Sequence, residues 1–163
     1  MTVTAIRKDP QSRTMTLEAE FDASPERVWQ LWADPRQLER WWGPPTYPAT
    51  VVEHDLRPGG KVAYFMTGPE GDEHHGWWTV VAVEEPHRLD LEDGFADSEG
   101  NHNDGLPITT FTVTFAELAS GATRMVIESR FASREGMDQM VEMGMEEGMT
   151  AAMRQIDAIL AGP

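Results

Sequence analysis

The sequence predicts an α+β fold, in which a curved antiparallel sheet of about six to seven strands lies against one long C-terminal helix. Two patterns indicate this arrangement. Between residues 49 and 131, nearly every run has the character of a strand and a short turn separates it from the next, which favours antiparallel pairing. From residue 134 to residue 160, apolar residues instead recur at helical spacing. The sheet therefore has one apolar face, and the long helix is its expected cover.

The first predicted strand covers residues 15–21, where apolar and polar residues alternate strictly. Ser24 then caps a helix that has Pro25 at its first position. Asp34-Pro35 begins a second short helix, which ends at Gly43-Pro44-Pro45 because proline cannot continue it. Two short helices are therefore expected between the first two strands.

Further strands follow the second helix in this prediction. Turns that contain glycine or proline, such as Gly59-Gly60 and Glu85-Pro86, separate most of them. These strands are expected at residues 50–57, 61–67, 75–84, 88–93, 109–117 and 123–131. The last two alternate between apolar and polar residues, so each has one face for the core.

The segment from residue 134 to residue 160 is about 40 Å long if it forms one helix. Six of the ten methionines lie in it. Its apolar stripe consists of Met137, Val141, Met145, Gly148, Met149, Ala152, Met153, Ile156, Ile159 and Leu160. Met143 falls outside the stripe and Asp138 inside it, so we expect the start of the helix to be partly exposed. Methionine is flexible and polarizable and packs around different shapes, which suits the wall of a cavity.

The composition limits the kind of partner. The chain has 163 residues and is expected to form one domain, with a formal net charge of −15. Such a charge repels nucleic acids and anionic membranes, so neither is an expected partner. The chain has no cysteine, which excludes disulfides and thiolate chemistry. Residues 1–10 lack the apolar core of a secretory signal, and no window reaches the roughly 18 apolar residues of a membrane span, so a cytoplasmic location is expected.

Three motifs carry a resemblance to a known family: residues 21–29 (FDASPERVW), 38–44 (LERWWGP) and 55–60 (DLRPGG). The chain resembles the small SRPBCC proteins, of the START and polyketide-cyclase type, that are related to the C-terminal domain of the activator of the heat-shock protein 90 ATPase. The resemblance covers roughly residues 14–161. It implies the helix-grip fold, in which the curved sheet wraps around the C-terminal helix.

The resemblance also gives meaning to two short segments. The family's last helix typically carries a Gly-Trp pair, and Gly148-Met149 stands in that place here. This replacement is expected to enlarge or soften the pocket. The segment Trp41-Trp42-Gly43-Pro44 is expected to plug one end of the sheet, and the alternative is that its tryptophans form a pocket wall.

Nine residues are candidates for contact with a ligand between the sheet and the helix. His54 alternates with Val52 and Leu56, so it is either a cavity residue or a hydrogen-bonded core histidine. The sequence leaves open which of Trp77 and Trp78 faces inward. The full set is His54, Tyr64, Met66, Trp78, Phe111, Val113, Met145, Met149 and Met153.

No catalytic motif and no metal site is recognised. His74 and His75 are adjacent in a strand, so their side chains face opposite ways and cannot chelate one ion. The acidic loop 94–106 lacks the spacing of a calcium loop and is expected to be a mobile lid over the cavity mouth. There is no Ser/His/Asp order, P-loop or dinucleotide motif, and we expect no cofactor.

These observations predict a non-catalytic protein that binds a small hydrophobic molecule between the sheet and the last helix. One alternative is an enzyme of cyclase or hydrolase type that uses His54 or Tyr64 as acid or base. The other, by family analogy, is a co-factor of the chaperone ATPase. The sequence names no ligand and leaves open whether the chain forms a homodimer.

Overall fold

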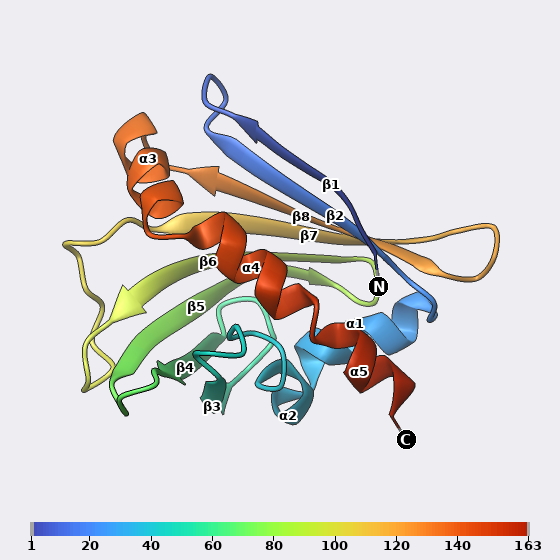
Figure 1. The fold of residues 1–163 in the computed structure, drawn as a ribbon, viewed down its shortest axis with the longest axis horizontal. Helices are drawn as coiled ribbons and strands as arrows, with labels where there is room; N and C mark the ends of the chain where they lie inside the picture. The colour runs from blue at the N-terminus through green and yellow to red at the C-terminus, as the bar shows by residue number, and fades with distance from the viewer. Residues whose placement is uncertain (1, 163) are drawn as a thin grey trace.

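The computed structural model describes residues 2–162, which form one curved antiparallel sheet crossed by helices from the C-terminal end of the chain (Figure 1). The spatial order of the strands is β1-β2-β8-β7-β6-β5-β4-β3. The strands are β1 (Thr2–Asp9), β2 (Thr14–Phe21), β3 (Ala49–His54), β4 (Lys61–Thr67), β5 (Glu73–Glu84), β6 (Arg88–Ala96), β7 (Thr109–Glu117) and β8 (Thr123–Phe131). The helices are α1 (Pro25–Ala33), α2 (Pro35–Leu38), α3 (Arg134–Glu142), α4 (Met145–Met153) and α5 (Ile156–Ala161).

The predicted α+β fold class is confirmed, with α1 and α2 between β2 and β3. The sheet has eight strands rather than six or seven, because the residues before β2 form the edge strand β1. In β1, Val3 and Ala5 are half-buried while Ile6 is exposed. The strand is held by backbone pairing with β2, so its sequence carries little of the alternation that marks a half-buried strand.

The two short helices begin where their capping residues predict. The Ser24 hydroxyl accepts a hydrogen bond from the Arg27 backbone N–H, 3.3 Å away, and Pro25 follows at the first helical position. The Asp34 carboxylate accepts from the Arg36 N–H at 2.9 Å. These caps fix where α1 begins and where the chain turns into α2.

The prediction of one continuous C-terminal helix is wrong, because the chain bends twice. Gly144 has φ 87°, a left-handed conformation that ends α3 and precedes α4. A second turn at Arg154 and Gln155 separates α4 from α5. The Gln155 side-chain amide donates to the carbonyl oxygen of Gly43 at 2.6 Å, which ties this turn to the segment after α2. Of the three helices, α4 crosses the sheet, α3 lies at the end of β8, and α5 lies in front of α1 (Figure 1).

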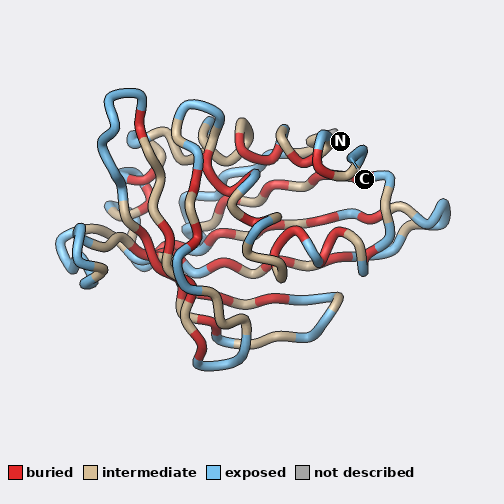
Figure 2. Tube along the Cα trace, turned by 90° about the horizontal axis from the view of Figure 1, so that it is seen from below, coloured by how far each residue is buried: buried red, intermediate tan, exposed pale blue. Residues whose placement is uncertain are grey.

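The core lies between one face of the sheet and the helices. Buried positions alternate with more exposed ones along the strands (Figure 2). In β2, for example, Met15 and Leu17 are completely buried. Met153 and Ile156 close the core from the helix side and are also completely buried. None of the helices within residues 2–162 is long and apolar enough to cross a membrane.

Four tryptophans fill the end of the core that lies next to α1 and α2. The ring centroids of Trp32 and Trp41 are 4.9 Å apart, and those of Trp42 and Trp78 are 4.8 Å apart. Trp32 and Trp78 join the two pairs at 5.8 Å. We call these four residues the tryptophan cluster. Edge-to-face packing of this kind adds to the stabilisation from burial alone.

Gly43 allows the chain to leave this cluster in a tight turn. A Cβ atom at this position would overlap the carbonyl oxygen of Tyr47. We expect Gly43→Ala to lower the free energy of unfolding by about 1–3 kcal/mol, because backbone atoms must move to relieve the overlap. Denaturant unfolding measures the change.

Gly148→Ala is the matched control. An added Cβ at Gly148 meets no atom within 4 Å, and alanine favours a helix interior by about 0.5–1 kcal/mol over glycine. This variant should therefore be as stable as the wild type or slightly more stable. Equal destabilisation by both substitutions would contradict the role given to Gly43.

Candidate ligand-binding cavity

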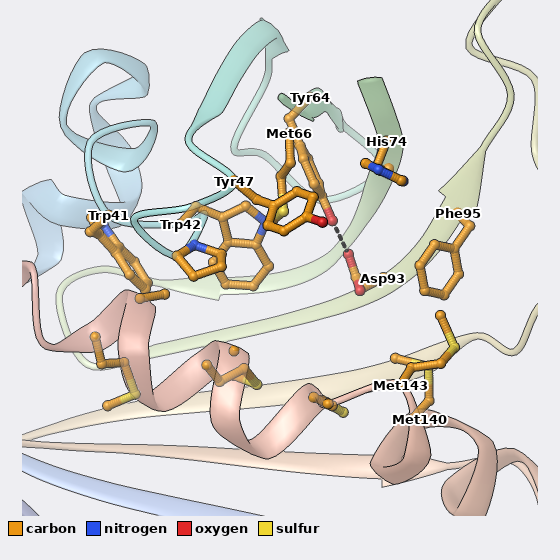
Figure 3. Close-up of a pocket in the computed structure, with 18 of the residues that line it drawn as sticks. Trp41, Trp42, Tyr47, Tyr64, Met66, His74, Asp93, Phe95, Met140 and Met143 are labelled. Atoms are coloured by element: carbon orange, nitrogen blue, oxygen red, sulfur yellow. Dashed lines mark hydrogen bonds between the residues drawn. The ribbon is translucent and has the colours of Figure 1, made fainter. Parts of the chain in front are cut away.

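A cavity of about 260 Å³ lies between the sheet and the break that separates α3 from α4. Aromatic residues of the sheet and of the segment after α2 form one side of it, and methionines of α3 and α4 form the other (Figure 3). Its wall consists of Trp41, Trp42, Pro44, Tyr47, Tyr64, Met66, His74, His75, Gly76, Asp93, Phe95, Phe111, Met140, Met143, Gly144, Met145, Gly148, Met149, Ala152 and Met153. The cavity is therefore largely apolar.

The helix side of the cavity owes its space to two glycines. Gly144 ends α3 in a left-handed conformation, so the chain turns there between Met143 and Met145. Gly148 lies inside α4, and the position its Cβ would take is open. Since methionine side chains have three rotatable bonds, this side can adjust to the shape of a ligand.

The sheet side of the cavity is more rigid than the helix side. The register of three strands there places the Tyr64 ring over Gly76. Tyr64 on β4 pairs with Gly76 on β5, which pairs with Phe95 on β6. A Cβ atom on Gly76 would lie 2.5 Å from the Tyr64 hydroxyl oxygen. Glycine at this position therefore leaves room for the tyrosine ring to lie across β5.

The Tyr64 hydroxyl donates a hydrogen bond to Oδ1 of Asp93 on β6 at 2.8 Å (Figure 3). Two indole N–H groups, of Trp42 and Trp78, are buried near this pair and have no hydrogen-bond acceptor within residues 2–162. We call Tyr64, Asp93, Trp42 and Trp78 the polar cluster. Its members Tyr64, Asp93 and Trp42 belong to the cavity wall, and Trp78 is buried behind them.

Burial governs the ionisation of both acids in this cluster. It raises the pKa of Asp93 from the ordinary 3.8 to about 7, although the hydrogen bond from Tyr64 acts in the opposite direction. Burial also raises the pKa of the Tyr64 hydroxyl well above 10, and the nearby Asp93 charge adds to this effect. Asp93 can therefore change its charge near neutral pH, while Tyr64 stays protonated.

Two histidines stand at the mouth of the cavity. Nε2 of His74 is 2.5 Å from an Asp72 carboxylate oxygen, and Nε2 of His75 is 3.2 Å from Glu73. The Tyr47 ring packs edge-on against His74, with centroids 5.6 Å apart. Within residues 2–162, no Lys or Arg lines the cavity, and no group of His, Asp and Glu is arranged to hold a metal ion.

Residues 22–161, most of the chain, match the family model described as Activator of Hsp90 ATPase homolog 1-like protein. The chain belongs to this family. The family predicted from the sequence motifs is thereby confirmed. A comparison with curated proteins gave no match.

Several solved structures of proteins of similar length resemble the chain along nearly its whole length. Protein Ms6760 from Mycobacterium smegmatis is 49% identical, with a TM-score of 0.91 and 99% of each chain covered. A protein from Arthrobacter aurescens is 51% identical, with a TM-score of 0.94 and coverage of 99% of this chain and 94% of that chain. A Rhodobacter sphaeroides protein is 26% identical, with a TM-score of 0.81 over 96% of this chain and 99% of that chain.

The structure brings six of the nine residues predicted from the sequence to the cavity wall. These are Tyr64, Met66, Phe111, Met145, Met149 and Met153. His54 does not line the cavity. Its Nε2 is 3.0 Å from the backbone oxygen of Trp32, which agrees with the alternative interpretation as a hydrogen-bonded histidine. Val113 and Trp78 are completely buried behind the wall. Contact of any of these residues with a ligand stays a prediction.

Asp93 was not predicted from the sequence, although it is the one carboxylate in the cavity wall formed by residues 2–162. Its position could have been found from the alternation of β6, since Leu89 and Leu91 are buried and residue 93 has the same parity. The predicted strand ended at residue 93, and acidic residues were too numerous in the sequence for this one to stand out. Met140, Phe95 and Tyr47 were also missed, because the helix break and the length of β6 bring them in.

The loop after β6 borders the cavity without forming its wall. Asp97 accepts hydrogen bonds from the backbone N–H groups of Glu99 and Asn101, each at 2.9 Å. The His102 ring stacks on Trp77 at 3.9 Å, on the opposite face of the sheet from Trp78. Trp78 therefore faces inward and Trp77 outward, and a lid role for the loop stays a prediction.

The raised pKa of Asp93 predicts a specific dependence of stability on pH. Because the native state binds this proton more tightly than the unfolded chain, the stabilisation is complete below about pH 3.8 and is lost as the pH rises towards 7. We expect the free energy of unfolding to fall more between about pH 5 and pH 8 in the wild type than in Asp93→Asn. Denaturant unfolding of both proteins at pH 5 and at pH 8 tests this prediction. If the free energy of unfolding changes by the same amount in the wild type and in Asp93→Asn, Asp93 titrates normally.

Proposed function

We propose that the protein binds one small, mainly apolar molecule in this cavity and holds it without transforming it. The observation that carries the proposal is the cavity itself, with aromatic rings on one side and flexible methionines on the other. Ligand sites are typically concave, mostly apolar and supplied with a few placed polar groups. Tyr64 and Asp93 are such groups here.

The methionine side chains on the helix side of the cavity can adjust their conformations to the shape of a bound molecule. Met145 and Met149 are half-buried, although both belong to the layer that covers the sheet. Partly exposed methionines next to an open space at Gly148 leave apolar surface for a ligand to cover. Binding then buries this surface and stabilises the fold.

An enzyme is the second candidate, and Asp93 is the residue that favours it. A half-buried carboxyl with a pKa of about 7 beside a tyrosine hydroxyl is suited to general acid or base chemistry near neutral pH. His54 lies away from the cavity wall, so Tyr64 is the sequence-predicted acid or base that remains for this alternative. Asp93→Asn should then abolish turnover and preserve binding.

Thermal unfolding with a panel of small apolar molecules tests the binding proposal. A ligand at 100 times its Kd should stabilise the fold by about 2.7 kcal/mol. For a chain of this size, that corresponds to a rise in Tm of roughly 5–10 °C. No shift with any compound, together with native mass spectrometry that finds the protein empty, would remove the support for this function.

Gly148→Leu is the matching cavity variant. The leucine side chain would extend into the open space at this position, so the shift in Tm should disappear. Ala158→Leu is its control, because Ala158 is exposed on α5 and does not line the cavity. This control should keep the full shift.

A further inference from the structure

We propose that the molecule bound in the cavity carries a positively charged amine, which pairs with the Asp93 carboxylate. The inference rests on the proposed binding function and names the chemical class of the ligand. Its basis is one acidic side chain in a largely apolar, aromatic wall to which, within residues 2–162, no Lys or Arg contributes.

The donors that the protein itself offers to Asp93 come from the sheet side. The Tyr64 hydroxyl donates to Oδ1 at 2.8 Å, and the Trp78 indole N–H lies close enough to the carboxylate to lower its pKa. The buried indole N–H groups of Trp42 and Trp78 lie near the Tyr64 oxygen and lower its pKa, so they favour negative charge there. An ionised carboxylate has about four acceptor positions on its two oxygens, so the protein donors leave acceptor capacity on Asp93 for a donor from the cavity.

The surroundings offer no other partner for this charge. Lys and Arg are absent from the wall as the structure describes it. The other titratable side chains of the cavity wall, all from the sheet or from the segment after α2, are Tyr47, Tyr64, His74 and His75. Both histidines are already paired with acids of their own strand or turn. In the described part of the chain, the helix side of the cavity contributes methionine, glycine and alanine alone.

Buried charges in proteins are normally paired, and an unpaired carboxylate in an apolar site is costly. A ligand ammonium group removes that cost, and the aromatic faces of Trp42, Tyr47 and Phe95 provide further attraction through cation–π contacts. The net charge of −15 favours the approach of a cation over that of an anion. An apolar body with one amine therefore matches both parts of the cavity.

Four naphthalene derivatives of nearly equal shape test the charge preference in the wild-type protein. They are 2-(aminomethyl)naphthalene, 2-(hydroxymethyl)naphthalene, 2-methylnaphthalene and 2-naphthoate, with affinities measured by calorimetry or NMR titration at pH 8. We expect the amine to bind more tightly than the alcohol and the naphthoate to bind least. An alcohol that binds as tightly as the amine, or a naphthoate that binds better, would overturn the proposal.

Asp93→Asn assigns the preference to this side chain. Since a hydrogen bond to a charged group contributes about 1.5–3 kcal/mol, the amine should bind this variant at least tenfold more weakly than the wild type. The affinity of 2-methylnaphthalene should change less than threefold. Asp90→Asn is the control, because Asp90 lies on the opposite face of β6, where it contacts Arg88 and Thr112.

The outcomes also separate this proposal from the binding function. If 2-methylnaphthalene and the alcohol bind but the amine gains nothing from Asp93, the cavity binds apolar molecules and the amine proposal is wrong. If none of the four compounds binds, the cavity is not a site for molecules of this size, and both proposals fall for this class of ligand.

Discussion

The tryptophan cluster determines where this protein has a core and where it has a cavity. Trp32, Trp41, Trp42 and Trp78 fill the space between the sheet and the helices at the α1–α2 end, with neighbouring ring centroids 4.8–5.9 Å apart. The Gln155 side chain, between α4 and α5, donates a hydrogen bond to the carbonyl oxygen of Gly43, which directly follows Trp42. This bond holds α4 and α5 against the α1–α2 end. The cavity lies beside this cluster and extends along α4 from the break at Gly144 to Met153, and Trp41 and Trp42 form part of its wall.

The two sides of the cavity differ in rigidity, and this difference shapes the proposed function. On the sheet side, strand register places Tyr64 over Gly76 and within 2.8 Å of Asp93, so the polar group has a fixed position. On the helix side, Met149 lies next to the open position at Gly148. A fixed anchor opposite an adjustable wall suits a site that selects one polar group and tolerates variation in the apolar body.

Much of the fold could be predicted from the sequence, because alternation along strands such as β2 and β8 records which face is buried. The broken helix could not, since Gly144 and Gly148 look alike in sequence although only Gly144 adopts a positive φ. Six wall residues were predictable from their faces. Asp93 was not singled out, because its pKa is raised by burial, which is a property of the packed structure.

Methyl NMR of the methionines tests the central claim, that the space beneath the helix break binds a small apolar molecule, most directly. Met66, Met140, Met143, Met145, Met149 and Met153 line the cavity, whereas Met15 and Met125 are completely buried elsewhere in the core. Titration with 2-(aminomethyl)naphthalene should shift the methyl signals of the first set and leave those of Met15 and Met125 unchanged. Saturable shifts confined to methionines outside the cavity, or no shifts at all, would contradict the account.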